Sequence, residues 1–158
     1  MSPLETTIKL DSKFTKKEFE ELVKIFFSTD IWTKFYPNTL ETIHIKGSGF
    51  NVSDIILEKY IDNTGYYIFN FIVDSIEIGQ NEANISWIGT CVKPHLDPKK
   101  FNCSLKYSLK YKSKSIYFTR TISIKHDIDN TTLDFNELLS SHYLFLDFVQ
   151  KYSQFLLK

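Results

Sequence analysis

Hydrophobic and polar residues alternate along much of this chain, most clearly between Ile116 and Ile124. One side of that segment carries Ile116, Phe118, Arg120, Ile122 and Ile124, while the other side carries mainly Ser, Thr and Tyr. Alternate side chains of a β-strand point to opposite faces, so the pattern predicts a strand with one buried face. Similar alternation, or an apolar run bounded by turn residues, predicts further strands at residues 4–10, 40–46, 54–61, 66–78, 83–92 and 101–112.

Two segments have helical periodicity instead. Thr15 and Glu18 have the spacing of a capping box, and an apolar stripe follows at helical intervals up to residue 28. A short helix is expected at residues 30–37, where a proline ends it. Residues 135–157 contain only three charged side chains, so they predict a long helix that is largely buried.

The order of these elements is strand, helix, short helix, several antiparallel strands and a long final helix. It resembles the START-like helix-grip superfamily of pollen allergens, polyketide cyclases and lipid-transfer domains. Local matches are the aromatic segment 31–37 after the first helix, the Gly47-Ser48-Gly49 turn and the amphipathic end helix. The resemblance implies an α+β fold over a single domain, residues 1–158. In that fold a curved antiparallel sheet of six to seven strands wraps the C-terminal helix, with two short helices after strand 1 and often a hydrophobic ligand cavity.

Arg120 is the only arginine in the chain, and its strand phase directs it into the apolar interior. A guanidinium group stays charged at physiological pH, so a buried one needs an acidic partner, trapped water or an anionic ligand. Asp74, Glu58 and Asp134 are the candidate internal partners. If none of them pairs with Arg120, the guanidinium can anchor the anionic end of an otherwise apolar ligand.

Further candidates come from the faces expected to meet the cavity. His142 lies on the buried stripe of the end helix, either as a ligand contact or as a structural histidine. Asn70 and Asp74 share one phase of the strand 66–78, and they face inward together unless a bulge switches the phase. Together with aromatic residues that either line the cavity or fill the core, the expected ligand-binding set is Arg120, His142, Asp74, Asn70, Trp87, Tyr107, Phe118 and Phe145.

Composition narrows the functional classes. The formal net charge is zero, which disfavours nucleic-acid binding, and 25 aromatic residues suit a large core or an aromatic cavity. The standard nucleotide, metalloprotease and hydrolase motifs are absent, so we expect no metal or cofactor and leave catalysis open. No signal segment or long apolar run is present, and we expect a cytoplasmic protein without a transmembrane segment.

The sequence therefore predicts binding or transport of a small hydrophobic or amphipathic, lipid-like ligand. The alternative is a protein-interaction module of cochaperone-like or ribosome-associated type with a filled core. Such a module would use either surplus apolar surface of the end helix or a basic face made of Lys106, Lys110, Lys112 and Lys114.

Overall fold

The computed structural model describes residues 3–93, 101–126 and 135–158. Seven strands, a 3₁₀ turn and three α-helices follow one another in the expected order. They are β1 (Leu4–Lys9), α1 (Lys16–Phe27), the 3₁₀ turn η1 (Thr29–Ile31), α2 (Trp32–Phe35), β2 (Thr39–Lys46), β3 (Ile55–Asp62), β4 (Gly65–Ile78), β5 (Glu82–Lys93), β6 (Phe101–Lys112), β7 (Ser115–His126) and α3 (Phe135–Leu156).

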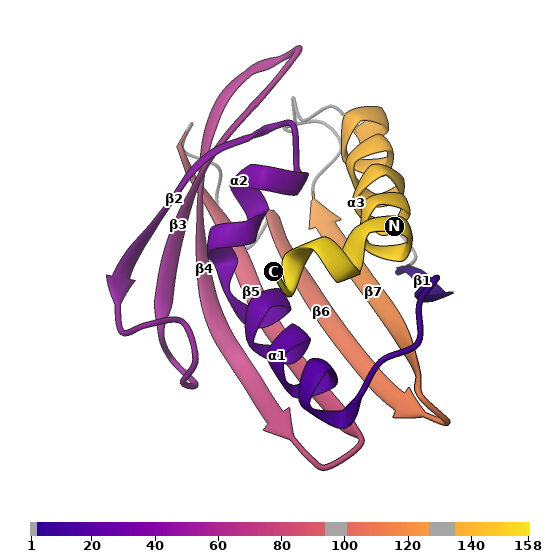
Figure 1. Cartoon of the computed structure of the whole chain (residues 1–158). Coiled ribbons are helices and arrows are strands. Elements are labelled where there is room, and N and C mark those ends of the chain that lie inside the picture. The colour runs from indigo at the N-terminus through magenta and orange to yellow at the C-terminus, as the bar shows by residue number, and fades with distance from the viewer. Residues whose placement is uncertain (1–2, 94–100, 127–134) are drawn as a thin grey trace.

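The strands form one antiparallel sheet in the order β1-β7-β6-β5-β4-β3-β2. Each strand from β2 to β7 is hydrogen-bonded to the next along the chain, while β1 pairs with β7 and so places the N-terminal strand at one edge (Figure 1). Sequential antiparallel strands need only short connections, which matches the turn residues between them. The predicted α+β architecture is confirmed.

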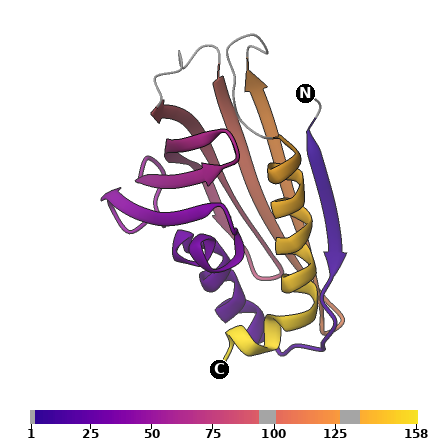
Figure 2. The same ribbon diagram turned by 90° about the horizontal axis from the view of Figure 1, so that it is seen from above.

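The helices cover the concave face of this curved sheet. In Figure 2 α3 runs along β7 and β1, and α1 and α2 lie beside it on the same face. The predicted capping box starts α1, since Thr15 Oγ1 accepts from the Glu18 N–H at 3.1 Å and Glu18 Oε1 accepts from the Thr15 N–H at 2.9 Å. None of the helices in the described residues is long and apolar enough to cross a membrane.

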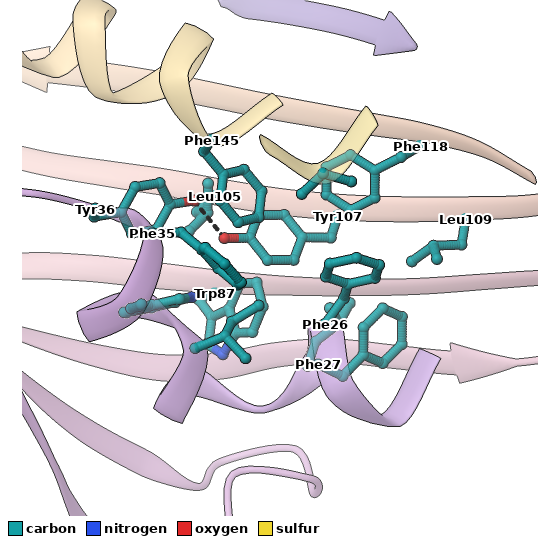
Figure 3. Packing of buried hydrophobic residues seen from close by; sticks show 14 of the residues in the cluster. Phe26, Phe27, Phe35, Tyr36, Trp87, Leu105, Tyr107, Leu109, Phe118 and Phe145 are labelled. Carbon is teal, nitrogen blue, oxygen red and sulfur yellow. Dashed lines mark hydrogen bonds between the residues drawn. The ribbon is translucent and has the colours of Figure 1, made fainter. Parts of the chain in front are cut away.

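Aromatic side chains fill the space between the sheet and the helices (Figure 3). The Phe145 ring from α3 lies 5.6 Å from Tyr107 of β6 and 5.7 Å from Phe118 of β7, measured between ring centroids. Trp87 of β5 packs edge-on against Tyr107 at 5.1 Å. All four rings are fully buried and each contacts Tyr107 or is Tyr107 itself, so this part of the interior is packed core.

Strand β4 differs from the expected orientation. Its inward residues are Tyr67, Phe69, Phe71 and Val73, which places Asn70 on the outer face of the sheet. Asp74 follows Val73 in the same outward phase as Asn70 and is exposed, and a register shift between Val73 and Ser75 marks a bulge at this point. Both phases of this strand are largely apolar, so the alternation did not identify the buried one. The expectation that Asn70 and Asp74 face a cavity is wrong.

Candidate functional site

A cavity of about 70 Å³ lies beside the aromatic core, between the first turns of α3 and strands β3, β4, β6 and β7. Its wall is mostly apolar, and Arg120 and Glu58 are the charged residues that face it. The lining residues are Trp32, Tyr36, Thr39, Glu58, Tyr60, Phe69, Phe71, Cys103, Leu105, Arg120, Ile122, Ile124, Leu138 and Ser141.

Arg120 points inward from β7 as predicted, with only 5% of its surface exposed. Its Nε donates to Tyr36 Oη at 2.8 Å, and Nη1 donates to His142 Nδ1 at 2.6 Å. The guanidinium carbon lies 5.1 Å from the centroid of the Tyr36 ring, within the range of a cation–π contact. These neighbours are neutral polar groups, so they solvate the charge without cancelling it.

An internal ion pair for Arg120 is not formed by the described residues. Glu58 faces the same cavity but makes no salt bridge with the guanidinium, and Asp74 is on the opposite face of the sheet. The third candidate, Asp134, lies outside the described residues. Burying a charge without a counter-ion costs several kcal/mol, and an anion bound at this guanidinium would reduce that cost.

His142 on α3 contacts Arg120 through a hydrogen bond. Because an arginine N–H can only donate, His142 Nδ1 must accept, and the ring proton is then on Nε2. Nε2 lies 3.0 Å from Thr6 Oγ1 on β1, to which it donates. Burial, and next the positive charge of Arg120, lower the pKa of His142 to about 4. His142 therefore stays neutral and positions Arg120, without being one of the lining residues.

Glu58 is a site residue that the sequence did not single out as a ligand contact. It extends inward from β3, is 8% exposed, and accepts a hydrogen bond at Oε2 from Thr39 Oγ1 at 2.6 Å. Burial raises the pKa of Glu58 to about 7, although the Thr39 hydrogen bond and the charge of Arg120 both act in the opposite direction. Glu58 is thus a carboxyl group that is largely protonated below neutral pH.

Two aromatic residues at α2 also belong to the site, although the expected ligand-binding set did not include them. Tyr36 contributes the hydroxyl that accepts from Arg120 and that lies 2.5 Å from the Tyr107 hydroxyl (Figure 3). Trp32 lines the cavity and is 1% exposed, and its indole N–H finds no acceptor within the described parts of the chain. An unsatisfied buried donor is rare and costs about 1–3 kcal/mol.

The expected aromatic ligand contacts are placed differently. Trp87, Tyr107, Phe118 and Phe145 all face inward, but they are not among the described residues that line the cavity. Rings from α3 and from the sheet contact one another there. The cavity is lined instead by residues of β3 and β4, together with Arg120.

Gly89 determines the shape of one wall. A Cβ atom at this position would lie 2.5 Å from a Phe71 ring carbon and 2.8 Å from Cys103 Sγ, and both of these residues line the cavity. Glycine therefore lets β4, β5 and β6 bring these side chains together across the concave face. Cys103 itself is a buried free thiol, and burial raises its pKa to about 12, so it acts here as an apolar wall group.

Chemically, the cavity combines apolar walls with hydrogen-bond donors. Arg120 and Trp32 are donors, and Glu58 becomes a third donor when it is protonated. Within the described residues, no cluster of His, Cys, Asp and Glu is placed to share a metal ion. This arrangement suits binding of a molecule with an apolar body and an acceptor-rich end.

Comparison with known proteins identifies the fold. No protein-family model and no curated protein matches the chain. Among solved structures, the hypothetical protein jhp0584 from Helicobacter pylori has a TM-score of 0.72 at 11% identity, over 96% of this chain and 88% of that one. A START superfamily protein from Mycobacterium smegmatis has a TM-score of 0.60 at 9% identity, over 90% and 88%.

The Zhui aromatase/cyclase from a Streptomyces species, strain R1128, is similar at a TM-score of 0.62 and 7% identity, over 99% of this chain and 96% of that one. At such low identities the likeness concerns the fold alone. The sheet order, the two short helices after β1 and the long final helix agree with it. The chain therefore has the START-like helix-grip fold.

Proposed function

We propose that this protein binds a small amphipathic ligand in the cavity between the sheet and α3. The observation that supports this most strongly is the buried guanidinium of Arg120, which borders an apolar cavity and is held by the neutral partners Tyr36 and His142. A ligand anion or strong acceptor would supply the charge that the described residues do not provide. In an apolar setting, such a charge-assisted hydrogen bond is strong.

The cavity volume restricts what can enter. At about 70 Å³ the cavity is well below the roughly 300–1,000 Å³ of most ligand pockets. It holds a polar group and a few carbon atoms. A longer ligand therefore has to extend beyond this cavity or to displace part of its wall, such as α3.

NMR titration tests this function directly. Octanoate and octan-1-ol share an apolar chain and differ at the polar end, so their binding separates the apolar walls from the anchor. We expect at least one of them to shift backbone amides of β3, β6 and β7, and we expect Arg120→Leu to remove any preference for octanoate. If neither compound shifts these amides, even at the limit of its solubility, the proposed function is wrong.

Arg120→Leu also serves a second measurement on the ligand-free protein. Replacing a buried ion pair by apolar side chains of similar volume is often neutral or stabilising by 1–4 kcal/mol, and removing a buried charge that has no counter-ion likewise removes the cost of desolvating it. Increased stability together with unchanged octanoate affinity would show that the charge does not serve this ligand. Leu105→Ala, in the same cavity wall, is the matched control, since it changes the apolar lining and leaves the charge in place.

A second candidate is a protein-interaction module. Tyr143, Leu144 and Phe155 on the outer side of α3 are between 54% and 66% exposed, which is a large apolar surface for one helix. Lys106, Lys110, Lys112 and Lys114 are also exposed, as an acidic partner would require. Native mass spectrometry after gentle purification distinguishes the candidates, because a bound small molecule supports the first and a stoichiometric protein partner supports the second.

A further inference from the structure

We propose that Arg120 and the protonated form of Glu58 together bind one carboxylate group, so that the site takes a monocarboxylic acid with an apolar body and binds it together with one proton. This inference rests on the proposed binding function and specifies its ligand. The two residues extend into the cavity from different strands, β7 and β3, and both are at least nine-tenths buried.

The N–H groups at the cavity outnumber the hydrogen-bond acceptors that the described residues offer to those N–H groups. Of the five N–H groups of Arg120, one donates to Tyr36 and one to His142, and the Tyr107 hydroxyl also interacts with the guanidinium. These three neighbours leave further N–H groups of Arg120 for a ligand, and Trp32 adds a buried N–H without an acceptor in the described parts of the chain. A carboxylate has two oxygens and about four lone-pair sites, so it can accept from several donors at once.

Glu58 must be protonated to take part. Two carboxylates that face each other in a buried site repel strongly, whereas a carboxyl group and a carboxylate can share one proton. Thr39 donates to Oε2, and Oε1 has no hydrogen-bond partner among the described residues. Because burial raises the pKa of Glu58 to about 7, the protonated carboxyl group is available near physiological pH without a large energetic cost.

The other described groups around Glu58 do not supply this proton. Tyr36 after α2 and Cys103 of β6 both have raised pKa values because they are buried, so they remain neutral near pH 7. Arg120 of β7 is charged, and His142 of α3 stays neutral. The remaining lining residues, from α2, β2, β3, β4, β6, β7 and α3, have aromatic, aliphatic or hydroxyl side chains. Glu58 is therefore the lining group whose charge changes near pH 7.

The same arrangement disfavours other ligand classes. A phosphate monoester brings nearly two negative charges to one guanidinium, and the cost of desolvating the second charge is not offset in an apolar cavity. An alcohol accepts at one oxygen only, so it leaves most of the donors unsatisfied. A monocarboxylate matches both the net charge and the number of acceptors.

The experiment measures octanoate and octan-1-ol dissociation constants by NMR titration at pH 6, 7 and 8, for the wild type and for Glu58→Gln. Octanoate is ionised throughout this range, since carboxyl groups titrate near pH 4–5. Binding that requires a proton on a group of pKa about 7 should weaken about tenfold between pH 6 and pH 8. The side-chain amide introduced by Glu58→Gln can still donate to the ligand and cannot titrate, so the octanoate affinity of the variant should stay constant and exceed that of the wild type at pH 8.

Octan-1-ol is the matched ligand and should bind more weakly than octanoate at pH 6, with little dependence on pH. Octanoate binding that does not change with pH in the wild type would overturn the proton-linked inference and leave the binding function intact. Stronger binding of octan-1-ol than of octanoate at pH 6 would overturn the carboxylate assignment. Failure of both compounds to bind removes the proposed function itself.

Discussion

Glu58→Gln should change the pH dependence of folding stability in ligand-free protein, with a sign that follows from burial. Folding raises the pKa of Glu58 from its ordinary value of 4.5 to about 7. Between these values the folded state holds a proton that the unfolded state has lost. The wild-type protein is therefore fully stabilised by this group below pH 4.5 and loses that contribution as the pH rises to 7.

The size of the effect follows from proton linkage. One proton difference between the two states changes stability by about 1.4 kcal/mol per pH unit. From pH 5.0 to pH 6.5 the difference in unfolding free energy, Glu58→Gln minus wild type, should increase by up to about 2 kcal/mol in favour of the variant. Taking this difference removes the contributions of all other carboxyl groups. Urea denaturation at four pH values measures it.

Glu77→Gln is the matched control, because Glu77 is an exposed carboxyl group on the neighbouring strand β4. Its difference from wild type should change much less over the same range. A nearly constant difference for Glu58→Gln over this range would show that Glu58 is already ionised in the folded protein above pH 5, which contradicts the proposed site.

Three further predictions test the surroundings. Folding lowers the pKa of His142 to about 4, so on acidification the unfolded state binds a proton before the folded state does, and this destabilises the wild type. Between pH 6.5 and 4.5, His142→Asn should therefore lose less stability than the wild type, by up to about 2 kcal/mol, as measured by urea denaturation. Gly89→Ala should cost about 1–3 kcal/mol through contact with Phe71 and should weaken octanoate binding, and Phe71→Leu in the same protein should reduce the stability cost. Thr15→Ala should lower stability by about 1 kcal/mol through loss of the α1 cap, detected as a lower melting temperature.

The fold was accessible from the sequence because most of its strands alternate clearly and pair with their neighbours in the chain. Arg120 is an example of what alternation can predict. Every other residue in its phase of the strand is apolar, so its inward direction was predicted correctly. Element order then matched that of the START-like superfamily, and this resemblance supplied the curved sheet wrapped on the final helix; six of the strands pair in chain order. The pairing of β1 with β7 was not predicted.

The rest of the site could not be predicted because some strands are apolar on both faces. In β3, Ile55 and Leu57 compete with Ile56 and Tyr60, so local alternation cannot decide whether Glu58 is buried. The decision is made by pairing with β4, where Ile56 lies opposite Phe71 and Glu58 opposite Phe69, both on the inner face. Asn70 and Asp74 were misplaced for the same reason.

The proposed role of Arg120 in ligand binding depends on how the fold stabilises its charge. A carboxylate partner would have neutralised the guanidinium and used its donors, as in an ordinary buried ion pair. Here a phenol hydroxyl and ring, contributed by Tyr36, and a neutral imidazole, contributed by His142, solvate the charge while leaving N–H groups on the cavity side. Glu58 stands opposite with a carboxyl group that burial keeps largely protonated below neutral pH. The net positive charge of the cavity near pH 6 is thus a consequence of burial, and ionisation of Glu58 removes it as the pH rises.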